Sequence, residues 1–245
     1  MKLLVCISHV PDTTTKITFT PDGKAFNTAG VQFIINPYDE MALTRALELK
    51  EAQGGTVTVI NVGLVATEPT LRKALAIGAD DAIRVNAEPT DALFVAGEIA
   101  SIAKGAGYDI IIGGRESIDY NGCQVMAMVA EFLELPSVAI ATKLDVSGTT
   151  ATLEREIDGG KEIVSVNLPF VVSAQKDFAE PRIPNMRGIM SARTKPLKVV
   201  EPTVSLKTNA SVAFQNPPPK SECKMVSADH PEELINLLHT EAKII

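Results

Sequence analysis

The chain has 245 residues and is acidic, because it carries 23 Lys and Arg residues against 30 Asp and Glu residues, for a net charge of −7. This length suits one large or two modest domains, and the 45% of hydrophobic residues supply a substantial core. The acidic balance without a basic run excludes nucleic acid as the main ligand, and 4% aromatic residues make ring stacking a minor device.

The cysteines and the N-terminus exclude further classes. Cys6, Cys123 and Cys223 lie far apart and form no CxxC or Cys/His cluster, so neither a disulfide framework nor a zinc site is predicted. Reduced thiols are typical of a cytosol-like compartment. The apolar run of residues 2–7 ends at Ser8-His9, too early for a signal peptide, and is expected to be a buried strand. No stretch approaches the ~18–20 apolar residues of a membrane span.

Short apolar runs alternate with helical patterns through the first 140 residues. Strands are expected at the β-branched and apolar runs 2–7, 56–62, 82–85, 108–112 and 137–141. Helices are expected where a broad apolar stripe is ended by Gly or Pro, at 38–53, 69–77, 90–104 and 124–135. This alternation predicts an α/β, Rossmann-like fold with a parallel sheet and helices on both faces.

The pattern changes after residue 150. Residues 150–157 and 161–168 flank Asp158-Gly159-Gly160, which predicts a β-hairpin whose turn uses the positive φ of Gly. Residues 178–202 lack periodicity, hold four prolines and are expected to be a long loop, whereas residues 231–245 have an amphipathic pattern. We therefore divide the chain into an α/β domain with the hairpin, 1–195, and an extended C-terminal arm, 196–245, which needs another surface to lie on.

Residues 112–124 are the strongest candidate for a ligand site. A predicted strand ends there, Gly113 and Gly114 let backbone approach a ligand, and a helix is expected to begin near residues 121–123, an arrangement typical of phosphate sites. Ligands of open parallel sheets bind beyond the carboxyl ends of strands, where Cys6 and Val62 also lie. An ordinary Gly turn is the alternative, because the chain has no GxGxxG motif and no Walker lysine.

Few other residues stand out. Asn36, before Pro37, is either a residue that reads a base or ribose or a turn residue at a helix start. Met186 lies in a Pro-flanked polar loop and is either a protein-contact anchor or a core residue. His9, His230 and His239 are isolated, which argues against metal ligation. Because no nucleophile, metal cage or acid/base pair is found, the sequence predicts no catalytic residue.

Several separated motifs together carry a family resemblance. They are Leu4-Val5-Cys6-Ile7, Asn36-Pro37, Leu71-Arg72-Lys73-Ala74-Leu75-Ala76, Ile118-Asp119, Arg155-Glu156-Ile157-Asp158-Gly159-Gly160, Leu168-Pro169-Phe170-Val171-Val172, Glu180-Pro181-Arg182 and Ile189-Met190-Ser191-Ala192-Arg193. From Lys2 to about Val200 the chain resembles the electron transfer flavoprotein β subunit family, and the remaining residues match weakly.

The resemblance implies an electron carrier subunit with an adenine-nucleotide-hydrolase-like fold. Proteins of this family pair with an α subunit and pass electrons from flavin dehydrogenases, such as acyl-CoA dehydrogenases, to a membrane quinone reductase. One FAD lies mainly in the α subunit, and the β subunit buries one AMP without reacting with it. The resemblance also implies a cytoplasmic location in a bacterium or the mitochondrial matrix in a eukaryote.

The resemblance assigns roles to particular residues. Glu156 matches a residue that pairs with the α subunit, and the loop 178–190 matches the segment that docks dehydrogenases, with Met186, Ile189 and Met190 as its apolar contacts. The positions that match the AMP site are Cys6, Asn36, Pro37, Tyr38, Asp39, Val62, Gly114, Arg115, Glu116, Ser117, Ile118, Asp119, Tyr120, Asn121, Gly122, Cys123, Gln124 and Val125.

Departures from the family pattern leave alternatives open. Residues 120–123 differ from the loop of electron-bifurcating members, which hold a second FAD in the β subunit, and this favours AMP here. Thr13 stands where some members place an aromatic residue near the flavin, and Ser191 replaces a Lys. An ATP pyrophosphatase would need a Ser-Gly-Gly-x-Asp-Ser loop where residues 8–12 stand. A stand-alone nucleotide-binding module would leave the hairpin and the Pro-rich tail unexplained.

Overall fold

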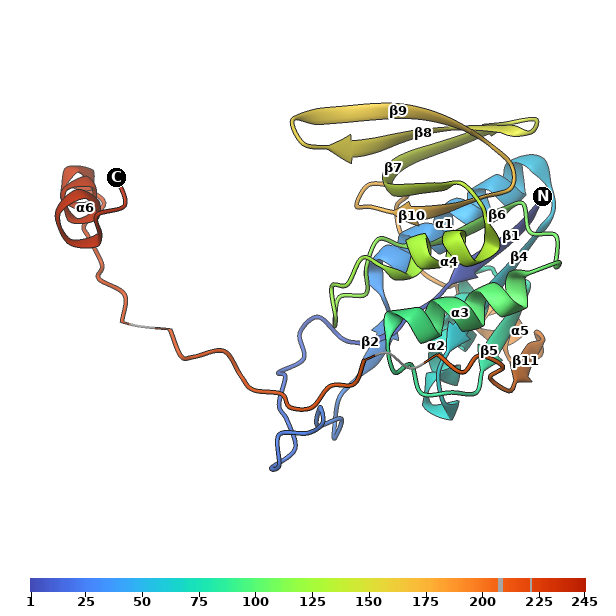
Figure 1. The fold of residues 1–245 in the computed structure, drawn as a ribbon, viewed down its shortest axis with the longest axis horizontal. Helices are drawn as coiled ribbons and strands as arrows, with labels where there is room; N and C mark the ends of the chain where they lie inside the picture. The colour runs from blue at the N-terminus through green and yellow to red at the C-terminus, as the bar shows by residue number, and fades with distance from the viewer. Residues whose placement is uncertain (207–208, 221) are drawn as a thin grey trace. The chain divides into compact units, whose positions relative to one another are not determined.

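The computed structural model describes residues 1–206, 209–220 and 222–245 (Figure 1). These residues divide into a larger unit, Met1–Ile17 with Asn27–Val212, and a smaller unit, Thr18–Phe26 with Ala213–Ile245. The predicted arm, 196–245, includes residues 207, 208 and 221, which lie outside the described residues.

The larger unit is built on one mostly parallel sheet, which within the described residues has nine strands in the order β11-β5-β4-β1-β6-β10-β7-β8-β9. The first seven of these run parallel, and β8 and β9 are antiparallel additions. The strands are β1 Lys2–Cys6, β4 Thr56–Val62, β5 Asp81–Val85, β6 Ile110–Gly114, β7 Ser137–Ser147, β8 Thr150–Ile157, β9 Gly160–Asn167, β10 Phe170–Ala174 and β11 Leu197–Val200. A separate ribbon pairs β2 (His9–Pro11) with β3 (Phe33–Ile35).

Helices cover both faces of the sheet (Figure 1). They are α1 Pro37–Gln53, the 3-10 turn η1 Val65–Thr67, α2 Glu68–Ile77, α3 Ala92–Ala103, α4 Val125–Leu133 and α5 Met186–Ala192. Strand β1 supplies both faces because its side chains alternate: Leu3 and Val5 pack in one core cluster with α1 and α2, whereas Leu4 packs in the other with α3 and α4. The predicted α/β fold with a parallel sheet is confirmed.

The hairpin is also confirmed, since β8 and β9 pair from Thr150↔Asn167 to Ile157↔Gly160 around a turn in which Gly159 has φ 82°. The predicted loop over 178–202 is wrong in two places, where α5 and β11 lie. Neither element has a strong local sequence pattern. Helix α5 has only seven residues and contains Gly188, and β11 pairs with β5 alone at the edge of the sheet.

The start of α4 differs from the prediction by a few residues. The helix begins at Val125 rather than near residues 121–123. Asn121 and Cys123 have φ angles of 50° and 51°, in the left-handed region, so the chain cannot be a right-handed helix there.

The smaller unit has a short bridge between Phe19 and Phe26, and the Phe19 ring stacks on Phe214 with centroids 5.3 Å apart. It also contains helix α6, Pro231–Leu237, which continues as a π-helical turn, Leu238–Ala242. Across all described residues, no helix combines the length and the hydrophobicity required to cross a bilayer.

Candidate functional site

The sheet changes its direction of winding at β1. From β1 the chain builds outward through β4, β5 and β11 on one side, whereas β6, β10 and β7 lie on the other. A crevice forms beyond the carboxyl ends of the strands at such a switch point, and this is where open α/β sheets bind ligands. The predicted residues Cys6 and Gly114 end the two strands on either side of this point, and Val62 ends the next strand, β4.

Asp39 ties the two sides of the crevice together. The residue is 3% exposed, and its carboxylate accepts hydrogen bonds from the amide of Ser8 through Oδ2 at 2.7 Å and from the amide of Gly114 through Oδ1 at 2.6 Å. Burial raises the pKa of Asp39 to about 7, and the two amide hydrogen bonds oppose that rise. A side chain in the first turn of α1 therefore fixes where the chain leaves β1 and β6.

Asn36 shapes the loop that follows β6. Its side chain is fully buried; Nδ2 donates to the carbonyl of Glu116 at 2.8 Å and Oδ1 accepts the amide of Ile118 at 3.3 Å. The residue also precedes Pro37, the first residue of α1. Both polar atoms of this amide are thus used by backbone 80 and 82 residues away, which favours a supporting role over direct reading of a base.

The loop between β6 and α4 carries a small polar network. The Cys123 thiol donates to the Glu116 carboxylate with Sγ and Oε2 2.9 Å apart, which lowers the pKa of Glu116 and raises that of Cys123. Arg115 pairs with the same carboxylate at 3.3 Å, and its guanidinium lies 5.7 Å from the Tyr38 ring centroid. Ser117 and Ile118 are half-buried, whereas Asp119 and all residues from Tyr120 to Gln124 are exposed.

The start of α4 has the backbone of an anion site. Cys123 is left-handed and the next residue, Gln124, is right-handed, an alternation that turns successive amides toward one point. Gln124 makes no side-chain hydrogen bond that would cap α4. At Gly114 a Cβ atom would lie 2.6 Å from both Asp39 Oδ1 and Tyr38 Cβ, so the backbone there must stay bare. Gly114 is thus required by the packing of α1 against β6, whereas the uncapped amides at the start of α4 fit a phosphate of a nucleotide.

Cys6 and Val62, two further predicted residues, are buried where β1 and β4 end. Cys6 is buried, and burial raises the pKa of its thiol, so this residue is a wall and not a reactive group. Asn61, beside Val62, donates to the carbonyl of Ile7 at 2.8 Å, whereas its buried Oδ1 has no hydrogen-bond partner among the described residues. Asn61 was not among the predicted site residues. The one signal for it in the sequence is that it is the only amide side chain in the run that forms β4.

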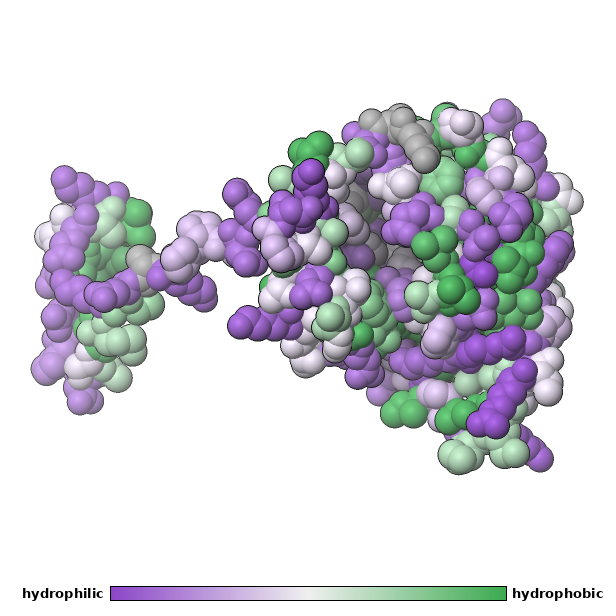
Figure 2. Space-filling view, turned by 90° about the horizontal axis from the view of Figure 1, so that it is seen from below, coloured by the Kyte–Doolittle hydropathy of each residue, from purple (hydrophilic) through white to green (hydrophobic). Residues whose placement is uncertain are grey.

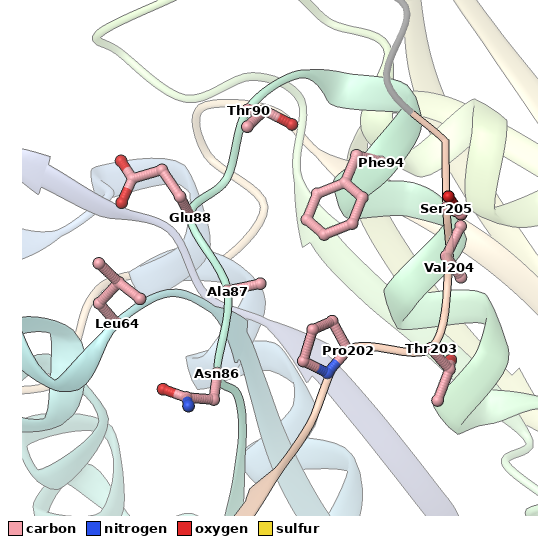
Figure 3. Close-up of a pocket in the computed structure, with 10 residues that line it drawn as sticks. All are labelled: Leu64, Asn86, Ala87, Glu88, Thr90, Phe94, Pro202, Thr203, Val204 and Ser205. Carbon is pink, nitrogen blue, oxygen red and sulfur yellow. The ribbon is translucent and has the colours of Figure 1, made fainter.

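Two hollows lie beside this set of residues, and neither is lined by any of them. One of about 470 Å³ opens between residues 86–90 and 202–205, where Ala87, Phe94 and Pro202 face the space between the two segments (Figure 3). The other, of about 330 Å³, adjoins His9, whose ring stacks on Phe33 and whose Nδ1 lies 2.7 Å from Thr70 Oγ1. In Figure 2 the larger unit is hollowed on a face where polar and hydrophobic side chains are interspersed.

The predicted partner contacts lie on the surface. Met186 is 73% exposed as the first residue of α5, and Ile189 and Met190 are exposed on the same helix. Met186 therefore does not fold back onto the core. Glu156 lies on β8, exposed, where it accepts a hydrogen bond from Gln175 at 2.8 Å.

Metal-ligating and disulfide chemistry find no support in the described part of the chain. No three His, Cys, Asp or Glu side chains gather there in a way that could hold a metal ion. Cys6, Cys123 and Cys223 are free thiols. The His9 side chain makes a hydrogen bond with Thr70 and stacks on Phe33.

Comparison with known proteins places this switch-point α/β structure in a class. A family model described as the electron transfer flavoprotein domain matches residues 24–205. The β subunit of electron transfer flavoprotein from Bacillus subtilis is 37% identical over 262 residues, covering 100% of both chains. The protein of the same name from Homo sapiens is 33% identical, covering 100% of this chain and 99% of the human one, and that of Syntrophomonas wolfei is 38% identical, covering 90% and 88%. The chain therefore belongs to the family of electron transfer flavoprotein β subunits.

Proposed function

We propose that this chain pairs with an α subunit, holds one AMP as a structural ligand and docks flavin dehydrogenases, so that the complex carries their electrons to a quinone reductase. FAD, lodged mainly in the α subunit, supplies the electron-carrying chemistry. The chain itself contributes binding and positioning and is not an enzyme. It acts in the cytoplasm of a bacterium or in the mitochondrial matrix of a eukaryote.

The observation that carries the AMP proposal is the set of hydrogen-bonded residues beyond the carboxyl ends of β1 and β6, at the point where the strand order reverses. Asp39 and Asn36 fix the backbone there through the hydrogen bonds to Gly114, Glu116 and Ile118. The start of α4, where no side chain of Gln124 caps the helix amides and Cys123 has a left-handed backbone, suits a phosphate. Cys6 and Val62 supply apolar walls at the ends of β1 and β4.

The docking proposal rests on the exposed apolar side chains around α5. Ile183 is 93% exposed, and Met186 and Met190 are also exposed, an arrangement that is costly in water unless a partner covers it. Flexible Met side chains adapt to different apolar surfaces, which suits a carrier that serves several dehydrogenases.

Substituting Met186→Ala tests the docking proposal. We expect electron acceptance from an acyl-CoA dehydrogenase to slow by about tenfold, the typical cost of losing an interface anchor. The FAD content of the αβ complex should stay unchanged, because Met186 contacts solvent and not the crevice. Stopped-flow reduction of the complex measures the rate, and absorbance of the extracted flavin measures the content.

Val199→Ala is the matched control, because Val199 is an exposed apolar residue on β11, outside the proposed docking segment. Its rate should equal that of the unmodified complex. Loss of flavin in the Met186→Ala complex, or an equal slowing by Val199→Ala, would contradict the anchor role.

A further inference from the structure

Helix α5, which presents the apolar side chains of the proposed docking segment, packs on α2 at unusually short range. Gly188 lies against the carbonyl oxygen of Ala76, and a Cβ at Gly188 would overlap that oxygen. The side chain of Asn185 caps α5 by accepting the amide of Gly188 at 2.8 Å. Because the backbones of the two helices are in contact here, the position of α5 on α2 is defined by backbone atoms and not by apolar side chains alone.

Lys195, just after α5, reaches back to the end of α2. Its ammonium donates to the carbonyls of Leu75 at 2.9 Å and Ala79 at 2.6 Å. Leu75 lies in the last turn of α2, where the carbonyls carry partial negative charge and lack donors within the helix, and Ala79 lies just beyond the helix end. Lys195 is partly buried, and that burial lowers its pKa.

Arg72, on α2, makes the reciprocal contact. Its Nη1 donates to the carbonyl of Ala192 at 2.8 Å, at the last residue of α5, and to the carbonyl of Lys195 at 2.7 Å. Each of the two helices thus has its C-terminal end held by a cation that belongs to the other helix or its extension. We call this pair of contacts, made by Arg72 and Lys195, the crossed clamp.

The other end of the segment is tied to α1. Arg182 forms a two-pronged ion pair with Glu51, at 2.6 and 2.8 Å, and its amide donates to Thr44 Oγ1 at 3.3 Å. The apolar side chains from Ile183 to Met190 therefore lie between two fixed points. A rigid segment loses less conformational freedom when a partner binds, so fixing it raises affinity without adding a contact.

We propose that Arg72 and Lys195 are positioning residues that hold α5 in place on α2 and thereby fix how Met186, Ile189 and Met190 meet a partner dehydrogenase. This inference rests on the proposed docking function. Neither cation touches the partner; each acts through the backbone of the segment that does.

The test uses the complete αβ complex with Arg72→Met or Lys195→Met and an acyl-CoA dehydrogenase that reduces the unmodified complex. We expect the KM of the dehydrogenase for the complex to rise about tenfold, equivalent to about 1.4 kcal/mol, with kcat within about twofold. Hydrogen exchange of the amides 186–194 should accelerate, whereas that of α3 should not. Arg72→Lys, which keeps a cation and a donor, should restore much of the affinity.

Arg193→Met is the matched control, because Arg193 is an exposed cation in the same segment whose side chain makes no hydrogen bond or ion pair with the described residues. A rise in KM as large in Arg193→Met as in Lys195→Met would mean that loop charge, not the clamp, governs docking. Loss of FAD or of α-subunit binding in both clamp variants would also overturn the inference, since the clamp would then serve the fold as a whole.

Met186→Ala separates this inference from the function on which it rests. If Met186→Ala raises KM and the two clamp variants do not, docking stands and the clamp inference fails. If Met186→Ala and both clamp variants leave KM unchanged, the docking function itself fails.

Discussion

A single carboxylate joins the ends of two neighbouring strands in this protein. Asp39 accepts the amides of Ser8 and Gly114 and is almost fully buried, and burial raises its pKa to about 7. An unfolded Asp has a pKa of about 3.9. Between these two pKa values the folded protein binds more protons than the unfolded chain, so the contribution of Asp39 to stability falls as the pH rises from about 4 to about 7.

We therefore predict a pH-dependent difference between the unmodified αβ complex and its Asp39→Asn variant. The free energy of unfolding of the unmodified complex, minus that of the variant, should decrease by on the order of 1 kcal/mol per pH unit over this window. Urea denaturation at pH 5, 6, 7 and 8 measures the difference. A difference that is flat from pH 5 to pH 8 would show that Asp39 is already ionised at pH 5.

Asn36 shows where sequence reasoning reaches its limit for single residues. Its place before Pro37 predicted either a turn residue at a helix start or a contact to a base. In the structure Asn36 lies directly before the first residue of α1, as expected of the turn residue. The sequence could not show that its amide holds the backbone of Glu116 and Ile118, because that contact depends on how β1 and β6 pair across the sheet. The same holds for Asp39, whose two partners are 31 and 75 residues away.

Helix α3 holds the segment that follows β11 by one buried carboxylate. Glu98 is fully buried; its Oε1 accepts the amides of Thr203 at 2.9 Å and Val204 at 2.6 Å, and its Oε2 has no partner among the described residues. The side chain of Val204 packs over Gly97, where a Cβ would lie 3.1 Å from it. This attachment also forms one wall of the hollow in Figure 3.

We predict that Glu98→Leu releases this segment, because the two amides lose their acceptor. The expected cost is about 1–3 kcal/mol in the free energy of unfolding. Hydrogen exchange should accelerate at residues 203–206 and stay unchanged in β1 and β4. Glu98→Gln keeps one acceptor oxygen and serves as the control; if it exchanges as fast as Glu98→Leu, the carboxylate oxygen is not what holds the segment.

Elements with a strong local pattern were predictable, and elements defined by distant pairing were not. The stripe of Leu43, Leu47 and neighbouring residues fixed α1, and Gly159 fixed the hairpin turn. Strand β10 was not predicted, although Phe170-Val171-Val172 is an apolar, β-branched run. Its position between β6 and β7 depends on pairing across the sheet and could not be predicted. Strand β11 and helix α5 likewise depend on β5 and α2 for their stability.

The larger unit carries the proposed nucleotide site and the exposed apolar segment on separate elements. The site lies beyond β1 and β6, whereas the segment is carried by α5 on α2. Changes to one should therefore leave the other intact, which is what a subunit that both holds a structural ligand and docks partners requires. The described residues outside the crevice add no metal-binding cluster.

We propose that this chain holds one AMP while FAD is lodged mainly in the α subunit. The most direct measurement is mass spectrometry of the small molecules extracted from the αβ complex after co-expression and purification, with each quantity expressed per heterodimer. We predict close to one AMP and one FAD. Two FAD without AMP would show that this chain holds a second flavin, and FAD without any second adenine nucleotide would contradict a nucleotide site beyond β1 and β6.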